Sequence, residues 1–566
     1  MNLPFTRLLR RIGREADALG VPAYAVGGVV RDALLGRITT DLDVVVVGPG
    51  SGIALAEAVA RTLGLRRPAV YARFGTAALT VPPEALARLG EPAAGPLVVE
   101  FVGARRESYR AESRKPVVED GSLADDLARR DFTVNALAVA LGKAGGEAAG
   151  TLVDAFGGQN DLAARRLRTP LDPAVTFADD PLRMLRAARF AAQLGFQVVP
   201  EAVQAMRAAA DRVAIVSQER LTDELDKLLG APAPSAGLRL LHETGLLEHL
   251  LPEIARLEGV EAVGAQRHKD NFFHTLDVLD NLVHLQRGSD DPDVNEDGRA
   301  RGRARWLRWA ALFHDVAKPD TKRFEPGTGW TFHGHDDLGA RRHVPRAFER
   351  LRLPQGEMLA YVQAIVRLHH RPSALVDGDV TDAAVRRLLF DAGDLTDDLM
   401  RFVRADVTSK NPRRARRYLA GFDRVEARMR EVEAGDELRN WQPPIDGHEI
   451  MDVLGVGEGL AVGLAKTWIR EAILDGEIPG THEAARALLE ARKPDALRRA
   501  ALFQQAVRTL PRTARRGTGA LKEALTHDAL PEDDAAALAY LHGVAEEAVS
   551  DGPAAGDGRP PGEERG

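Results

Sequence analysis

A pair of glycines and a pair of aspartates near the N-terminus constrain the fold more than any other feature of the sequence. Gly27 and Gly28 follow a short apolar stretch and precede a helical pattern, and Asp41 and Asp43 stand at the head of a run of valines. Because alternate residues of a strand point to the same face, the two carboxylates project to one side of a sheet. The segment therefore predicts a glycine turn, a helix and a strand that brings two acids together.

This arrangement suits the binding of a nucleoside triphosphate with its metal ions. Hard cations such as Mg²⁺ take carboxylate oxygen ligands, and displacement at a triphosphate requires stabilised attacking and leaving oxygens. Gly27 and Gly28 allow close approach of the backbone, N–H groups of the following helix can bind phosphate, and Arg31 adds positive charge. A tight turn and a strand-end charge pair explain either motif alone, whereas their ordered combination favours nucleotidyl transfer.

Composition limits the class of protein. The chain has 566 residues, of which 45% are hydrophobic, so several domains with buried cores are expected. It contains no cysteine, which excludes disulfides, thiolate zinc sites and cysteine nucleophiles. No apolar run reaches the length of a membrane span, so we expect a cytoplasmic protein without a membrane partner. The net charge of −7 argues against indiscriminate coating of nucleic acid but leaves local basic surfaces open.

Hydrophobic periodicity divides the chain into a mixed N-terminal part and a helical remainder. Residues 1–165 combine alternating and helical patterns, whereas the helical period dominates from residue 178 onward. The expected strands cover 24–26, 42–47, 76–81 and 97–102, and the expected helices cover 5–19, 29–35, 52–63 and 123–129. The predicted fold class is α+β, with an N-terminal sheet domain followed by all-α domains.

A second group of polar residues follows the last of these helices. Arg129 and Arg130 offer planar guanidinium groups for phosphates, and Asp131 and Asn135, four residues apart, can share one helical face. Arg130, Asp131 and Asn135 could together position a nucleotide. A solvated helix start capped by Asp131 explains the segment equally well.

A third group, Asp179, Asp180 and Arg183, opens the next helical pattern. A carboxylate and a guanidinium three or four residues apart lie side by side on a helix. Such an acceptor and donor can hydrogen-bond to the base edges of cytosine and adenine, whereas uracil presents its groups in the opposite sense. The group predicts selection of CTP and ATP over UTP without a nucleic-acid template, although acids before Pro181 are also an ordinary helix start.

These motifs, in this order, resemble the class II tRNA nucleotidyltransferase and bacterial poly(A) polymerase family, within the DNA polymerase beta superfamily. The resemblance also includes Asp154-Ala155-Phe156-Gly157-Gly158 with Asp161-Leu162, and Glu219-Arg220. It implies a polymerase-beta-like head domain, followed by helical neck, body and tail domains, that adds C, C and A to the 3′ end of tRNA from CTP and ATP. Enzymes that add only CC or only A, and poly(A) polymerases, share these motifs and remain alternatives.

The resemblance also implies roles for single residues. Asp41 and Asp43 are the catalytic carboxylates that bind Mg²⁺, and the nucleotide-binding residues are Gly27, Gly28, Arg31, Arg130, Asp131 and Asn135. The protein template consists of Asp179, Asp180 and Arg183, with Asp179 where the family usually has Glu. Glu100 is either a third carboxylate or a solvated strand end. The polar segment 105–121 occupies the place of the family's flexible loop, and its composition is typical of mobile surface.

A separate cluster lies downstream, at His274, His314, Asp315 and Asp406. Its imidazole and carboxylate groups suit a divalent metal, and the pattern resembles an HD domain, a helical metal-dependent phosphohydrolase fold. The resemblance implies a site for a divalent metal of unknown identity, with further candidates at His333, His335, His369 and His370. Such a domain can hydrolyse phosphate esters or simply support tRNA. Two other classes stay open: an HD phosphohydrolase with a regulatory transferase domain, and a non-catalytic RNA-binding protein.

A basic patch and the domain division complete the expectations. The patch contains Arg413, Arg414, Arg416 and Arg417, which either contact tRNA phosphates or form a solvated helix face. The expected domains are a head over 1–165, a neck over 166–252, an HD body over 253–435, a tail over 436–500 and a C-terminal extension over 501–566. We expect the extension to be disordered from residue 551, where Gly, Pro and Glu predominate. The sequence leaves the oligomeric state open.

Overall fold

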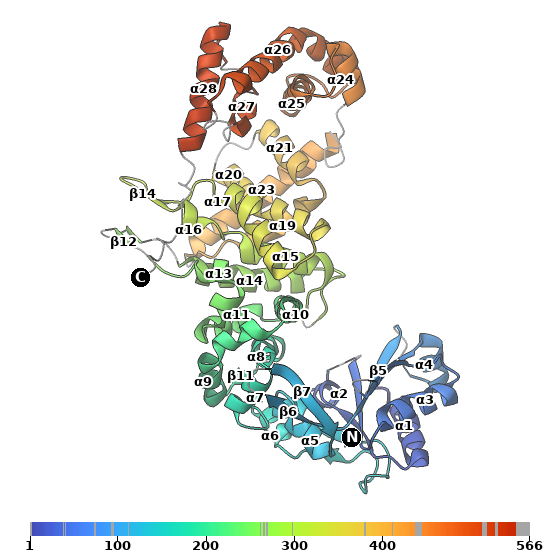
Figure 1. Cartoon of the computed structure of the whole chain (residues 1–566). Helices are drawn as coiled ribbons and strands as arrows, with labels where there is room; N and C mark the ends of the chain where they lie inside the picture. The colour runs from blue at the N-terminus through green and yellow to red at the C-terminus, as the bar shows by residue number, and fades with distance from the viewer. Residues whose placement is uncertain are drawn as a thin grey trace, which may run out of the picture. The chain divides into compact units, whose positions relative to one another are not determined.

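A mixed seven-stranded sheet forms the scaffold of the N-terminal part, which is drawn in blue in Figure 1. Its strand order is β3-β4-β5-β2-β1-β8-β9. Its strands are β1 Ala23–Val26, β2 Asp41–Val46, β3 Ala69–Tyr71, β4 Thr76–Val81, β5 Leu97–Gly103, β8 Ala138–Ala140 and β9 Leu152–Val153. Strands β2 and β5 run parallel, and the other neighbours run antiparallel. The Asp-x-Asp pair therefore begins a central strand of the sheet.

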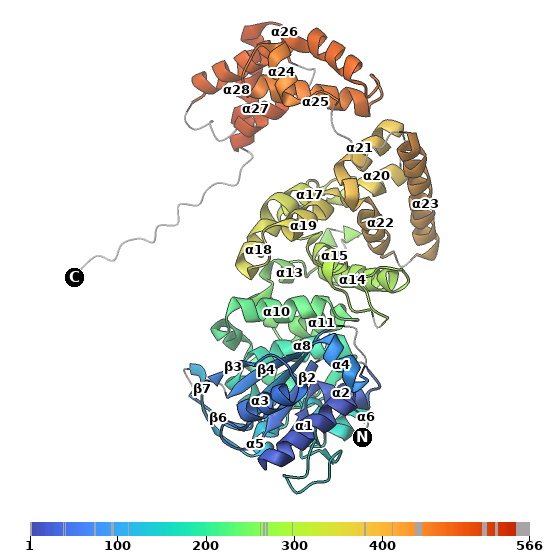
Figure 2. The same ribbon diagram turned by 90° about the vertical axis from the view of Figure 1, so that its right-hand side faces the viewer.

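The structure is a computed structural model. It describes residues 3–37, 39, 41–72, 75–91, 95–110, 113–260, 262–263, 266–267, 270–296, 298–377, 381–409, 411–435, 444–511, 518–526 and 530–550. The side chains of Asp41 and of residues 107–118 lie outside this description, as does the expected disordered stretch from residue 551. The chain divides into two compact units, one of residues 1–370 with 398–415 and one of residues 371–397 with 416–566. Figure 2 labels helices of both units in a second view.

One face of the sheet is covered by helices α1 (Thr6–Leu19) and α3 (Ser51–Leu63), of which α3 packs on β2, β4 and β5. Strand β5 alternates accordingly, because Leu97, Val99 and Phe101 are buried while Val98 and Glu100 are exposed. The alternation leaves Glu100 on the opposite face, which is open for functional side chains.

The four strands and four helices expected in this part are all present, with α2 at Gly28–Leu34 and α5 at Leu123–Ala128. The segment 105–121 differs from the expected surface loop, because it forms an antiparallel hairpin of β6 (Arg105–Arg110) and β7 (Ser113–Asp120). Its strands are rich in charged residues, so they lack the apolar alternation from which a strand is recognised.

Helices follow the sheet domain. They are α6 Gly158–Ala163, α7 Pro173–Asp179, α8 Leu182–Leu194, α9 Pro200–Ala208, α10 Gln218–Leu229, α11 Pro234–Glu243, α12 Leu246–Leu250 and α13 Pro252–Ala255. Helix α8 packs against both α10 and α11. Gly237 permits the close approach of α11, because a Cβ there would lie 2.7 Å from the carbonyl oxygen of Ala188. This packing fixes α8 beneath the open face of the sheet.

The first unit continues with the HD body. Its elements include α14 Asn271–Arg287, α15 Gly302–Phe313, α16 Lys318–Thr321, β14 Arg323–Glu325, β15 Gly329–Thr331, α17 His335–Leu338, α18 Val344–Leu351, α19 Glu357–Leu368 and α22 Thr396–Ala405. The fully buried Arg308 anchors the polar segment after α14, since its guanidinium donates to the carbonyl oxygens of Leu229, Ala231 and Gly298. Residue 299 is thereby held near α10.

The second unit is helical and contains α20 Arg371–Asp377, α21 Asp382–Ala392, most of α23 Pro412–Gly435, α24 Gly447–Leu454, α25 Leu460–Leu474, α26 His482–Thr509, α27 Thr518–Ala524 and α28 Asp534–Ser550. One hydrophobic core runs from Ile445 to Ala545, so the helices after residue 500 pack with those before it. The division of the chain into five domains stays a prediction. Among the described residues, no helix is long and apolar enough to cross a membrane.

Candidate functional site

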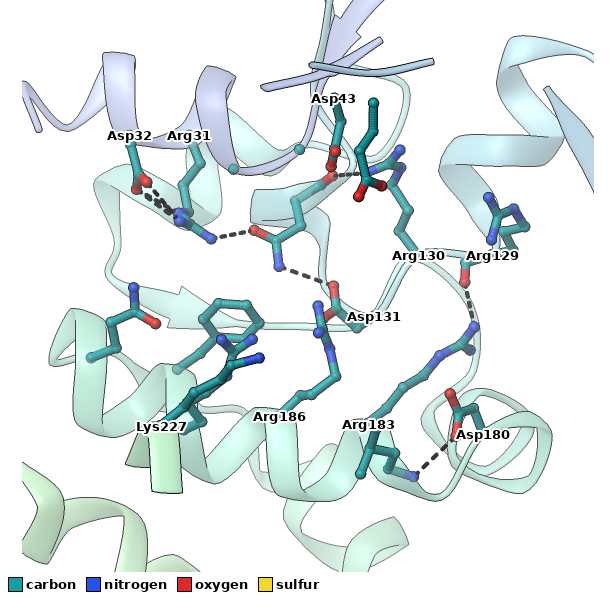
Figure 3. Close-up of a pocket in the computed structure, with 18 of the residues that line it drawn as sticks. Arg31, Asp32, Asp43, Arg129, Arg130, Asp131, Asp180, Arg183, Arg186 and Lys227 are labelled. Carbon is teal, nitrogen blue, oxygen red and sulfur yellow. Dashed lines mark hydrogen bonds and ion pairs between the residues drawn. The ribbon is translucent and has the colours of Figure 1, made fainter. Parts of the chain in front are cut away.

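A cavity of about 670 Å³ lies between the sheet, the glycine turn and helix α8 (Figure 3). The basic residues that line it are Arg31, Arg105, Arg129, Arg130, Arg183, Arg186, Arg189, Arg220, Lys227 and Arg299. The acidic ones are Asp32, Asp43, Glu100, Asp131 and Asp180. The excess of basic residues favours a polyphosphate or a nucleic-acid backbone as ligand.

The glycine turn forms one wall of the cavity and has the conformation expected from the sequence. Gly27 has φ 72°, a left-handed value that favours glycine, and α2 begins at the next residue. A Cβ at residue 27 would lie 2.7 Å from Nη1 of Arg130, so a larger residue would displace this guanidinium. Gly27 and Gly28 both line the cavity.

The carboxylates enter the cavity from β2 and β5. Asp43 pairs in register with Glu100 on the parallel strand, and both line the cavity. Figure 3 shows Asp43 directed into this space. Asp41 lies two residues earlier on β2, in register with Val98. Oxygen donors on adjoining strands fit a hard divalent cation such as Mg²⁺.

A buried hydrogen-bonded network connects the glycine turn with the second group of polar residues (Figure 3). Arg31 donates to both oxygens of Asp32, and its Nη1 donates to Oδ1 of Asn135 at 2.7 Å. Nδ2 of Asn135 in turn donates to Oδ1 of Asp131 at 3.0 Å. Asp131 and Asn135 come together as expected, but around the 3-10 turn Thr133–Asn135 and not on a helix face, because Phe132 before that turn is extended.

The network continues into the neck through Asp131. Its Oδ2 accepts from Arg186 of α8, which also lies 3.6 Å from Glu224 of α10, and Glu224 pairs with Arg189 at 2.7 Å. Burial alone would raise the pKa of Asp131, but Arg186 and the hydrogen bonds from Asn135 and Phe132 lower it to about 2. Asp131 is therefore a buried, ionised link between the sheet domain and α8.

The predicted base-selecting residues lie where α7 gives way to α8. Asp180 and Arg183 line the cavity, whereas Asp179 is the last residue of α7 and α8 begins at Leu182. Arg183 donates to the carbonyl oxygens of Thr176 and Arg129, at 3.1 and 2.5 Å. Asp180 accepts from the backbone N–H of Leu182 and from Arg220. Both side chains line the cavity and are engaged with other protein groups.

Sequence reasoning missed several cavity residues. Arg186 and Arg189 follow Arg183 at intervals of three on α8, so their shared helical face was a usable signal. Lys227 lies on α10 and pairs with Asp223 at 2.6 Å. Arg299 comes from the polar segment after α14, whose composition is typical of an exposed loop and gives no signal for a site.

The predicted HD residues also come together, in the first unit. Nε2 of His274 lies 3.0 Å from Oδ1 of Asp406, and Nε2 of His314 lies 3.1 Å from Oδ2 of Asp315. Burial alone would raise the pKa of Asp315, but His314 and Lys318 hold it well below its usual value. Ionised oxygen and imidazole nitrogen at these spacings fit a divalent metal. His333 is exposed and belongs to neither metal-ligating group of the described residues.

Three family descriptions match the chain. The poly A polymerase head domain matches residues 23–168, the probable RNA and SrmB-binding site of polymerase A matches residues 195–257, and the HD domain matches residues 271–408. The head carries the glycine turn and the carboxylates, and the HD match contains the histidine cluster. Together, the fold and the site define a nucleotidyltransferase of the poly(A) polymerase type with an HD domain.

Proteins with similar sequences indicate which kind of nucleotidyltransferase this chain is similar to. An A-adding tRNA nucleotidyltransferase of Deinococcus radiodurans is 35% identical over 380 residues, which are 65% of this chain and 79% of the relative. A CC-adding tRNA nucleotidyltransferase of Thermus thermophilus is 33% identical over 484 residues, 82% of this chain and 93% of the relative. The crystal structure of the Bacillus stearothermophilus CCA-adding enzyme in complex with CTP shares the fold, with TM-score 0.57 and 24% identity over 87% of this chain and 98% of that one. The chain belongs to the tRNA nucleotidyltransferase family.

Proposed function

We propose that this chain adds C and A nucleotides from CTP and ATP to the 3′ end of tRNA without a nucleic-acid template. The observation that carries the proposal is the cavity in which Asp43 and Glu100 face the glycine turn and a wall of basic residues. Membership of the tRNA nucleotidyltransferase family supports tRNA as the acceptor. A non-catalytic RNA-binding protein would have no use for carboxylates directed into such a cavity.

Asp41 and Asp43 would hold Mg²⁺ in this site, with Glu100 beside them as a further oxygen donor. Bound Mg²⁺ supplies the charge that stabilises the attacking and leaving oxygens. Groups of the protein itself bind and orient the triphosphate. The glycine turn admits the triphosphate close to the backbone, and Arg130 lies beside it. The 3′-hydroxyl of tRNA attacks the α-phosphorus in line. The bond between the α-phosphorus and the oxygen that bridges the α- and β-phosphates breaks, and this oxygen leaves with pyrophosphate.

Nucleotide positioning falls to the buried network and base selection to the start of α8. Arg31 orients Asn135, and Asn135 together with Arg186 orients Asp131, so these groups keep one arrangement as the nucleotide enters. Asp180 supplies a hydrogen-bond acceptor to the base and Arg183 supplies a donor. Asp179, the last residue of α7, directly precedes Asp180 in the chain. Arg183 donates one hydrogen bond from each of Nη1 and Nη2 to a carbonyl oxygen, and a guanidinium has five N–H donors, so it retains donors for a base.

The tRNA backbone needs cations outside the nucleotide pocket. Lys227 and Arg299 line the cavity on the side of α10 and suit phosphates near the 3′ end. The residues of the predicted basic patch are exposed in the first turns of α23, and we propose that they contact phosphates further along the tRNA; these are Arg413, Arg414, Arg416 and Arg417.

Product length tests the proposal and separates its variants. tRNAs that end before CCA, after C and after CC are incubated with CTP and ATP, singly and together, and the products are sized. Relatives named A-adding, CC-adding and multifunctional CCA protein are 33–35% identical to this chain, so each length pattern has a precedent. We expect complete CCA addition; extension by many A residues would instead identify a poly(A) polymerase, and no extension of any tRNA would refute the proposal.

The metal role of the carboxylates has a separate test. Asp43→Ala should abolish incorporation while tRNA binding persists, and Asp41→Ala should do the same. Glu57→Gln is the matched control, because Glu57 is an exposed acid on α3, away from the cavity, and its loss should leave the rate unchanged. Retained incorporation in both aspartate variants would contradict the assignment.

A further inference from the structure

A loop of the HD body reaches the cavity of the head. The loop connects α14, which ends at Arg287, to α15, which begins at Gly302, and Arg299 on this loop lines the cavity. The other residues that line the cavity lie between residues 27 and 227, in the sheet domain and the neck. The HD body therefore adds one cation to a cavity that is otherwise built by earlier parts of the chain.

Hydrogen bonds fix the backbone around Arg299. Its N–H donates to Oδ1 of Asn295 at 2.8 Å, and its carbonyl oxygen accepts from the N–H of Asn295 at 3.1 Å. The N–H of the next residue, Ala300, donates to the carbonyl oxygen of Gly230 at 2.8 Å. A Cβ at residue 230 would lie 2.9 Å from the carbonyl oxygen of Ala300, so this close approach requires glycine. The loop is thus joined to the end of α10.

Arg308 of α15 strengthens the same junction from the interior. Its Nη1 donates to the carbonyl oxygens of Leu229 and Ala231 at 3.0 and 2.6 Å. Its Nη2 donates to the carbonyl oxygen of Gly298 at 2.9 Å, and its Nε donates to Oε1 of Gln286 at 2.8 Å. Because Leu229 is the last residue of α10, the guanidinium lies at the C-terminal end of a helix, where the dipole stabilises positive charge. Burial lowers the pKa of Arg308 to about 9, so the group is still a cation at neutral pH.

The chemistry of Arg308 indicates a role in positioning. Moving a charge from water into a protein interior costs free energy, and an apolar side chain of similar length would avoid this cost. A guanidinium offers instead five N–H donors in one rigid plane, and here they contact α10, α14 and the loop at once. These bonds hold Gly298, the residue directly before Arg299, at a fixed distance from the end of α10.

We infer that Arg308 is a positioning residue for nucleotide addition, which acts by holding Arg299 where it binds a phosphate in the 3′ strand of tRNA. The inference rests on the proposed function, because it assigns a contact with the acceptor of that reaction. Ten basic and five acidic residues line the cavity. A triphosphate that carries its own Mg²⁺ neutralises only part of the excess charge, so the cavity also suits phosphates of a second ligand. Because its backbone is already fixed, Arg299 loses little conformational freedom when it donates to two phosphate oxygens.

The kinetics of CTP addition to a tRNA that ends before CCA test the contact. Arg299→Gln should raise the KM for tRNA about 10-fold, the size expected for the loss of one charged hydrogen bond, and leave the KM for CTP unchanged. The slope of log KM for tRNA against log salt should fall by about 0.7–0.9, the value for one phosphate contact. Arg301→Gln is the matched control, because it removes the same charge from the same loop. The Arg301 side chain is 78% exposed and does not line the cavity, so both KM values should stay unchanged.

A double-mutant cycle tests whether Arg308 acts through Arg299. Arg308→Met should raise the KM for tRNA by about the same factor as Arg299→Gln. Combining the two substitutions should raise it no further than Arg308→Met alone, because both remove one phosphate contact. Additive effects would overturn the positioning role. Gly230→Ala displaces the loop in a variant that keeps the buried cation, because its Cβ would lie 2.9 Å from the carbonyl oxygen of Ala300, and it should also raise the KM for tRNA alone.

The outcomes separate this inference from the proposed function. If the wild type extends tRNA and Arg299→Gln has the same KM for tRNA as Arg301→Gln, the inference is wrong and the proposed function stands. A rise in the KM for CTP alone would place Arg299 on the incoming nucleotide and would equally overturn the inference. If the wild type extends no tRNA, the proposed function is wrong. The dissociation constant of tRNA, measured without nucleotide, then still shows whether Arg299 binds a phosphate.

Discussion

Asp131 connects the sheet domain to the neck, and its replacement by Asn removes the charge while keeping the shape. The side chain is 6% exposed and its pKa is lowered to about 2 from 3.8. At about 1.4 kcal/mol per pKa unit, this difference corresponds to about 2 kcal/mol of stabilisation at neutral pH. Asp131→Asn should therefore weaken the attachment of α8 by about 2 kcal/mol, because Arg186 loses its anionic partner.

Hydrogen exchange measured by mass spectrometry reports this loss locally, which suits a chain of several domains. A loss of about 2 kcal/mol corresponds to about 30-fold faster exchange of the α8 amides. The pKa in the folded protein is the lower one, so the stabilisation is complete above pH 3.8 and disappears as the pH falls toward 2. The difference between wild type and variant should consequently be the same at pH 5 and pH 7.

Glu243→Gln is the control for this experiment. Glu243 pairs with Arg207 at 2.9 Å in the same neck, but both side chains are more than half exposed. Exposed pairs contribute about 0–1 kcal/mol, so exchange in the control should change by less than about five-fold. Unchanged α8 exchange in Asp131→Asn, or a difference that vanishes between pH 7 and pH 5, would refute the role of the buried charge.

Two further variants test the cavity. Arg183→Ala should lower kcat/KM for CTP and ATP by about 10- to 150-fold, because a hydrogen bond to a charged group contributes about 1.5–3 kcal/mol. The value of kcat/KM for UTP should stay unchanged. If primer extension shows the same selectivity in the variant as in the wild type, Arg183 does not select the base. Gly27→Ala should lower the rate of nucleotide addition, because the new Cβ would lie 2.7 Å from Nη1 of Arg130. Gly20→Ala is the control, since Gly20 also has a positive φ, of 68°, but has open space around it. The control should lose stability and keep its activity. Equal activities of the two glycine variants would contradict the close approach at residue 27.

Local patterns predicted the scaffold of the active site well. The strand that begins at Asp41 and the glycine turn were recognisable because each depends on neighbours in sequence: alternation for the strand, and a positive φ for Gly27. The hairpin over 105–120 was missed for the same reason, since its charged residues carry no alternation.

Partners that are distant in sequence could not be predicted. The pairing of Asp131 with Arg186 spans 55 residues, and the carbonyl of Arg129 that accepts from Arg183 lies 54 residues away. Which side of α8 meets the sheet domain is decided by its packing on α10 and α11, which the helical period alone does not reveal. Likewise, the sequence placed His335 and His369 near the HD motif but could not show that Oδ1 of Asp315 turns toward them.

Three buried acids, Asp126, Asp131 and Glu224, explain how a pocket so rich in arginine can be stable and still serve a triphosphate. Asp126 is fully buried and pairs with Arg129 and Arg130, as Asp131 and Glu224 do with the arginines of α8. Each acid forms an ion pair with its guanidinium and fixes its orientation, so the arginine side chains lose little conformational freedom when phosphate binds. Because these pairs connect to Asn135 and through it to Arg31 on α2, one network of contacts links α8 with the helix that follows the glycine turn.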